Sequence, residues 1–89
     1  METGIAKQVV TDKQIQTLRD CFDVVRVSGE GYIEIRRAFF YRHGQSAASV
    51  AADVKAIVPE AEMIEAREAW KPWPRSSYFI VRISRTIPA

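Results

Sequence analysis

The sequence predicts a single α+β domain in which two helices cover one face of a four-stranded, antiparallel-type sheet. Three observations lead to this prediction. The chain has 89 residues, which is enough for one hydrophobic core. Its apolar residues follow a helical period in two segments and a two-residue period in four others. The elements also occur in the order α-β-β-α-β-β, which is typical of two hairpins that pack a shared sheet against two helices.

We expect residues 11–86 to form this domain, residues 1–10 to form a flexible N-terminal arm and residues 87–89 to form a short tail. Hydrophobic residues make up 47% of the chain, a value typical of globular proteins. No apolar run approaches the ~20 residues of a membrane helix. The first ten residues have neither the basic start nor the apolar stretch of a signal peptide. These features predict a cytoplasmic protein with no membrane partner.

Two helices are predicted from their end signals and their apolar spacing. Thr11 and Gln14 have the spacing of a capping box, in which two side chains satisfy free backbone N–H groups at a helix start. The apolar residues that follow predict a first helix over residues 12–21. Ser46 is a suitable N-cap for the second helix. Pro59 cannot continue that helix, so we expect it to end at the preceding residue.

Alternating apolar and polar residues, bounded by turn residues, predict four strands. They cover residues 24–28, 32–41, 63–70 and 78–85. Gly29 and Gly31 tolerate a positive φ, so the first two strands are expected to form a hairpin. Arg37 falls on the apolar phase of its strand, and we expect a β-bulge at Arg36-Arg37 to re-aim the residues beyond it. In the third strand, Ile64 shares the phase that is expected to face the core.

The strand order follows from the helix between the second and third strands. That connection requires a right-handed crossover, so the two strands it joins are expected to be parallel, with room for another strand between them. The fourth strand fills this gap and gives the spatial order 3-4-2-1. The apolar content agrees, because the second and fourth strands are the richest in apolar residues and take the central positions. This arrangement is a permuted, ferredoxin-like two-layer sandwich.

The strand phase that faces away from the helices is open to solvent or to a partner. It combines arginine and aromatic residues with two acidic residues, Glu34 and Glu65. Eight of the nine arginines fall in the strands or their loops, so the positive charge of the chain is concentrated on the sheet. The candidate binding face comprises Arg26, Tyr32, Arg36, Phe40, Arg42, Arg67, Tyr78 and Arg82.

Three interpretations of this face are open. Arginine and aromatic residues are enriched at protein–protein interfaces. The same residues bind single-stranded nucleic acid, because guanidinium groups bind phosphate while rings stack on bases. They also occur on plain solvated sheets, where arginine stems cover the rings. We expect a protein partner or self-association, for example as a homodimer, with nucleic acid as the alternative.

The loop between the third and fourth strands is a second candidate. Trp73 stands between Pro72 and Pro74, so it has little conformational entropy to lose on binding and suits an anchor, with Arg75 beside it. The alternative is that Trp73 folds back to cover one end of the core, since tryptophan is highly buried on average.

The sequence offers little catalytic chemistry. Cys21 is the only cysteine, which excludes a disulfide within the chain, and its side chain is expected to be buried. Arg42-His43-Gly44 resembles the signature of the histidine phosphatases, in which the histidine is the nucleophile. That family needs a second histidine and a larger fold, and His43 is the only histidine. We therefore expect no metal, no cofactor and no enzymatic activity, with a pocket between subunits as the remaining enzymatic alternative.

Overall fold

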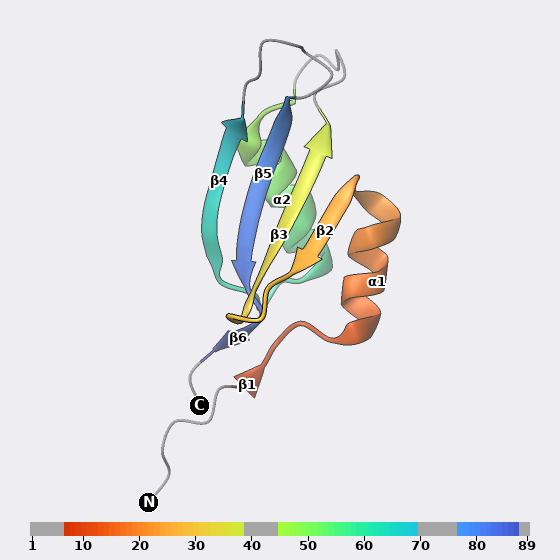
Figure 1. Ribbon diagram of the computed structural model, residues 1–89, viewed down its shortest axis with the longest axis vertical. Coiled ribbons are helices and arrows are strands. Elements are labelled where there is room, and N and C mark those ends of the chain that lie inside the picture. Colours follow the sequence, from red (N-terminus) through yellow and green to blue (C-terminus); the bar gives the residue numbers. More distant parts are fainter. Residues whose placement is uncertain (1–6, 39–44, 70–76, 88–89) are drawn as a thin grey trace, which may run out of the picture.

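The computed structural model describes residues 7–38, 45–69 and 77–87. Its elements are, in chain order, β1 (Lys7–Gln8), α1 (Asp12–Cys21), β2 (Val24–Val27), β3 (Tyr32–Ala38), α2 (Ala47–Ile57), β4 (Met63–Ala69), β5 (Tyr78–Ser84) and β6 (Thr86–Ile87). Strands β2, β3, β5 and β4 lie side by side in this order in one open sheet (Figure 1), and every neighbouring pair is antiparallel. The predicted α+β domain, with two helices and a four-stranded antiparallel sheet, is confirmed.

The order of the strands agrees with the connection through α2. Strands β3 and β4 are both antiparallel to β5, so they run parallel to each other with β5 between them. Helix α2 crosses behind the sheet to join them (Figure 1). Read from β4, the order is β4-β5-β3-β2, which is the order that the crossover argument predicts.

One hydrophobic core lies between the sheet and the two helices. Alternate residues of β3 and β5, such as Ile33, Ile35 and Val81, are completely buried on the helix side. Leu18 of α1 and Val54 of α2 are also completely buried and belong to the same cluster. Both helices therefore cover one face of the sheet, and no segment among the described residues covers the opposite face.

Both helices begin at the predicted caps. The side chain of Thr11 accepts a hydrogen bond from the backbone of Gln14, and the Gln14 side chain accepts one from the Thr11 backbone. Ser46 forms the same reciprocal pair with Ser49 at the start of α2. In the β2–β3 turn, Gly31 has a φ of +94°, a conformation that favours glycine. These local signals hold because they depend only on neighbouring residues.

Residues 7–10, at the end of the segment that is expected to form a flexible arm, pair and pack with the rest of the domain. Lys7–Gln8 pairs with Thr86–Ile87 in a separate two-stranded ribbon below the main sheet (Figure 1). Val9 is buried and its backbone N–H donates to the carbonyl of Arg85, while Val10 is completely buried. The start of the domain is thus fixed by its end, a long-range contact that a short segment without periodicity does not reveal.

The prediction of a β-bulge at Arg36-Arg37 is wrong, because β3 pairs with β5 in unbroken register through both residues. Arg37 stays on the helix side, where it forms an ion pair with Asp53 of α2 at 2.7 Å and lies over the ring of Phe22 at 4.4 Å from the ring centroid. The sheet's irregularity is instead in β4, between Met63 and Glu65. This shift leaves Ile64 54% exposed rather than in the core.

Candidate functional site

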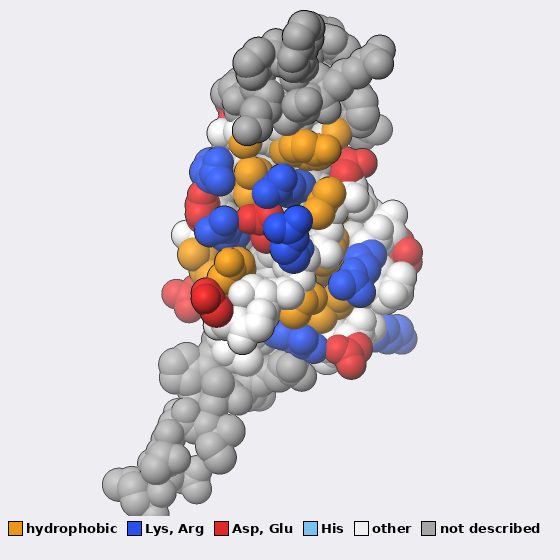
Figure 2. All heavy atoms as spheres, in the orientation of Figure 1, with side chains coloured by type: hydrophobic (Ala, Val, Ile, Leu, Met, Phe, Trp, Pro, Cys, Tyr) orange, Lys and Arg blue, Asp and Glu red, His pale blue; other side chains and the backbone are white. Residues whose placement is uncertain are grey.

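The uncovered side of the sheet carries the predicted arginine and tyrosine residues. We call this side the open face, and in the described residues its large side chains are Arg26, Tyr32, Glu34, Arg36, Glu65, Arg67, Tyr78, Ile80 and Arg82. Figure 2 shows this face, where basic side chains gather around acidic ones over the middle of the sheet. The strand register explains the gathering, because residues opposite each other on neighbouring strands lie on the same face.

Two rows of side chains cross the open face from β2 to β4. The first row is Arg26, Glu34, Arg82 and Glu65. The second row is Val24, Arg36, Ile80 and Arg67. Opposite charges therefore alternate along the first row, and each pair of neighbours in it is an arginine beside a glutamate.

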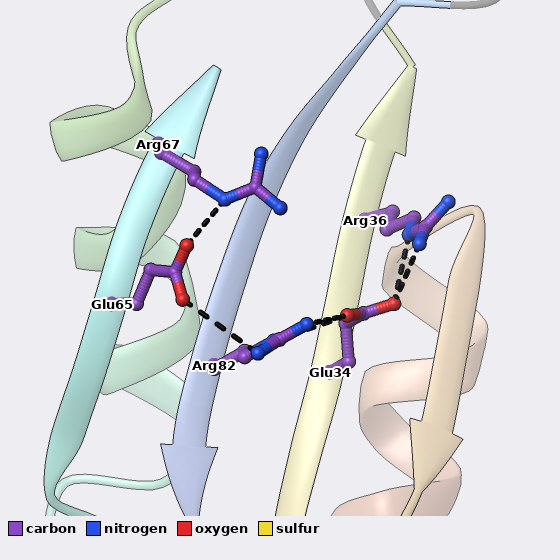
Figure 3. A network of polar contacts seen from close by, with 5 residues as sticks. All are labelled: Glu34, Arg36, Glu65, Arg67 and Arg82. Carbon is purple, nitrogen blue, oxygen red and sulfur yellow. Dashed lines mark hydrogen bonds and ion pairs between the residues drawn. The ribbon is translucent and has the colours of Figure 1, made fainter. Parts of the chain in front are cut away.

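Glu34 lies at the centre of this pattern and is only 5% exposed. Its Oε2 accepts a hydrogen bond from Nε of Arg36 at 2.9 Å and forms an ion pair with Nη2 of Arg36 at 2.8 Å. Its Oε1 accepts from Arg82, with Nε at 3.1 Å and Nη2 at 3.0 Å. Each carboxylate oxygen is thus held by two nitrogens of one guanidinium group (Figure 3). A carboxylate this buried is sustained because both of its oxygens are paired.

The ionisation of Glu34 follows from these contacts. Burial on its own would raise the pKa of Glu34, but the hydrogen bonds and positive charges of Arg82 and Arg36 outweigh it, so the pKa of Glu34 lies below its ordinary value. The hydrogen bond with Glu34 in turn raises the pKa of Arg82. Both groups are therefore charged at neutral pH, and the network is ionic.

Glu65 extends the network to the edge strand. Its carboxylate accepts a hydrogen bond from Nε of Arg67 and lies 3.8 Å from Nη1 of Arg82. A continuous chain of contacts therefore runs from Arg36 through Glu34, Arg82 and Glu65 to Arg67 across three strands (Figure 3). Three arginines and two glutamates leave this chain of contacts with one net positive charge.

The arginines also cover the aromatic rings of the open face. The guanidinium of Arg36 lies 5.8 Å from the ring centroid of Tyr78, and that of Arg82 lies 5.4 Å from the ring centroid of Tyr32. Ile80, between the two central arginines, is only 3% exposed although it points away from the helices. The centre of the open face is thus closed by its own charged side chains.

Five of the predicted face residues are linked by this network or its ring contacts: Tyr32, Arg36, Arg67, Tyr78 and Arg82. Arg26 also lies on the face and is exposed, with Glu34 opposite it on β3. Phe40 and Arg42 lie outside the described residues, as do His43 of the phosphatase-like motif and the loop pair of Trp73 and Arg75.

The sequence interpretation missed the role of the two glutamates. The alternation of apolar and polar residues puts Glu34 and Glu65 on the open face, but it does not predict that they organise the arginines. A signal for this was present, because Glu34-Ile35-Arg36 and Glu65-Ala66-Arg67 share the pattern Glu-x-Arg. On a strand, this spacing puts the acid and the base on the same face. Each glutamate indeed bonds the arginine two residues after it.

Other chemistry is sparse in the described part of the chain. Cys21, expected to be buried, is exposed at the last residue of α1. In residues 7–38, 45–69 and 77–87, no three His, Cys, Asp or Glu side chains are grouped so that they could hold a metal ion. Neither described helix is long and apolar enough to cross a membrane.

Comparison of the chain with protein-family models, with curated proteins and with solved structures gave no match. The open face must therefore be interpreted from its own geometry.

Proposed function

We propose that this chain is a non-enzymatic protein-interaction module that binds its partner through the open face. We further infer that its sheet is a circular permutation of the ferredoxin-like arrangement, with the face that lacks helices serving for contact. The partner is a protein or a second copy of the chain, and the contact is made by the charged and tyrosine side chains of the open face on β2, β3, β4 and β5.

The observation that supports this proposal is the ion-pair network itself. Arginine side chains normally lose considerable rotamer entropy when a partner immobilises them. Here Glu34 and Glu65 hold three guanidinium groups in fixed positions before any partner arrives. Preorganised arginine and tyrosine side chains are typical of residues that dominate the binding energy of protein interfaces. The remaining exposed guanidinium edges are free to donate to carboxylates and carbonyls of a partner.

The same network makes nucleic acid the weaker candidate. Phosphate groups would have to compete with carboxylates that already bind the guanidinium groups of Arg36 and Arg82. Bases would have to displace those guanidinium groups from the rings of Tyr78 and Tyr32. One observation still favours nucleic acid as a second function, because Arg26 adds an exposed positive charge to a face that already has an excess of cations.

The two functions are separated by cross-linking from a defined position. A photoreactive amino acid replaces Arg67, whose side chain is 48% exposed on the open face. The matched control replaces Arg19, an exposed arginine on α1 that does not belong to the open face. In extract of the native cells, we expect a discrete protein adduct from position 67 and none from position 19. The adduct protein is then purified and its binding measured against wild type and Glu34→Gln.

The proposal requires that the purified partner binds wild type and binds Glu34→Gln less tightly, because the arginines of that variant are no longer held. Equal adducts from both positions would contradict it. Nucleic acid is tested with labelled single-stranded RNA at about 50 and 200 mM salt, over which phosphate-driven binding weakens steeply. Saturable RNA binding with that salt dependence, and no protein adduct, would establish the second function in its place.

A further inference from the structure

The alternating charges in the first row of the open face indicate which partner this face fits. From β2 to β4 it reads arginine, glutamate, arginine, glutamate, so its charges alternate from a positive end to a negative end. The order of charges in such a row is complementary to the same order read in the opposite direction. When a second copy is turned so that its row runs in the opposite direction, every charge meets the opposite charge.

A two-fold axis produces this reversal. The axis lies parallel to the strands, above the open face and midway between β3 and β5, which are the two central strands. It brings β2 of one copy over β4 of the other, and β3 over β5. Arg26 then meets Glu65 of the second copy, and Glu34 meets its Arg82. Because the symmetry is two-fold, each contact occurs twice.

The remaining positions are compatible with the same axis. In the second row, Arg36 meets Ile80 of the second copy and Arg67 meets its Val24, so no two like charges face each other. In the outer rows a large side chain meets a small one. Tyr32 lies in the row of Ser84, which becomes its opposite residue, and Tyr78 lies in the row of Ala38, which becomes its opposite residue.

We infer that the open face binds a second copy of this chain in this two-fold arrangement, with the strands of the two sheets roughly aligned. This inference rests on the proposed function and names its partner. Arg26 and Glu65 carry the recognition, since Arg26 is exposed and the Glu65 side chain keeps 31% of its surface exposed, whereas Glu34 is almost covered. The outer pairs therefore set the register of the two sheets.

The size of the face sets the strength of the association. Four strands ~4.8 Å apart, with seven residues at ~3.4 Å per residue along the long strands, span roughly 19 by 24 Å, or about 450 Å² per copy. This area lies well below the ~800 Å² per partner of a stable interface. The dimer is therefore weak and concentration-dependent, and salt weakens it further because charged pairs select it.

Sedimentation equilibrium tests the inference on the full chain, with Cys21→Ser as background because an exposed cysteine could form a disulfide between copies. From about 10 µM to about 1 mM protein, we expect a reversible monomer–dimer equilibrium. Arg26→Glu and Glu65→Arg each place like charges at both outer pairs, so each alone weakens the dimer by roughly tenfold or more. Mixing the two variants restores opposite charges at both pairs, and the mixture dimerises where neither variant does.

The rescue on mixing excludes a trivial loss of folding, because a misfolded variant cannot regain its partner. Thermal unfolding of each variant adds a second check, and Arg19→Glu on α1 serves as the matched charge-reversal control, which keeps wild-type association. A wild-type chain that stays monomeric up to about 1 mM, or variants that fail to rescue each other although both are folded, would overturn the inference. The protein-interaction proposal would survive that result, because the adduct from position 67 would then contain a different protein.

Discussion

Replacing Glu34 by alanine removes the carboxylate that holds Arg36 and Arg82 together. Removing one member of a fully buried ion pair costs about 3–5 kcal/mol, because the remaining charge is left buried without a partner. In this network the two arginine side chains are 32% and 34% exposed, so water replaces part of the lost interaction. We therefore expect Glu34→Ala to lower the free energy of unfolding by about 2 kcal/mol.

Glu34→Gln separates the charge of this residue from its shape. The folded-state pKa of Glu34 lies below its unfolded value, so its charge stabilises the fold above the unfolded pKa of about 4.3 and this contribution is lost as pH falls through the lower, folded-state pKa. The stability difference between wild type and Glu34→Gln should therefore be largest near neutral pH and shrink in acid.

Urea unfolding followed by circular dichroism measures this difference at about pH 7 and about pH 3, a range that spans the titration of an ordinary glutamate. Asp53→Asn is the matched control, because it neutralises an exposed carboxylate that pairs with Arg37 on the helix side and leaves the network intact. If wild type and Glu34→Gln differ by the same amount at both pH values, the carboxylate charge does not stabilise the fold and the account of the network is wrong.

Two further predictions concern the frame around the open face. Gly31→Ala should destabilise the protein by about 1–2 kcal/mol, because the φ of +94° at this position is unfavourable for a residue with a Cβ. Steric contact adds little, since the nearest atom to that Cβ would be 3.9 Å away. Thermal unfolding measures the change, and a loss of stability below a few tenths of a kcal/mol would contradict the prediction. Val10→Ala should lower the free energy of unfolding by about 2 kcal/mol, since Val10 is completely buried. Amide hydrogen exchange should rise first at the adjoining Val9, whose N–H donates to the carbonyl of Arg85. Unchanged protection of Val9 would show that residues 7–10 are not fixed by this contact.

The sequence was sufficient to predict the core and the layer arrangement. Ile33, Ile35, Val81 and their neighbours alternate with polar residues, and such a two-residue period leaves only one way to turn a strand towards two apolar helices. The capping residues were predictable for a similar reason, because Thr11 bonds a residue only three positions away. In each case, the physical cause lies within one element.

The failures have the opposite origin. Arg37 looked misplaced on its strand because its partner, Asp53, belongs to α2 and its ring contact, Phe22, follows α1. Glu34 looked like an ordinary exposed acid because its burial depends on Arg82, which is 48 residues away in the chain. Ile64 has the sequence spacing of a core residue, but the β-bulge between Met63 and Glu65 shifts the register and turns its side chain away from the core. Each error concerns a residue whose environment is set by register with a distant segment.

The network also raises the question of why a sheet would keep charged side chains over its two central strands. Moving a carboxylate and two guanidinium groups out of water costs several kcal/mol per ion before their attraction is counted. Replacing such a set by apolar residues of similar volume is often neutral or stabilising. If these side chains only had to cover β3 and β5, apolar side chains of similar volume would hold the fold as well, and we propose recognition of a partner as the reason for the charges.

A combined substitution of Glu34→Leu, Arg36→Met and Arg82→Met tests this argument. It removes the three charges together, so no ion is left unpaired, and methionine retains much of the arginine stem that covers Ile80, Tyr32 and Tyr78. We expect urea unfolding to show stability at least equal to wild type, in contrast to Glu34→Ala, while the charge-selected pairing of Arg26→Glu with Glu65→Arg becomes weaker in this background. If the combined variant is instead destabilised as much as Glu34→Ala, the network exists to hold the sheet together. The arginines would then have a structural role, and the case for a recognition surface on this face would lose its main support.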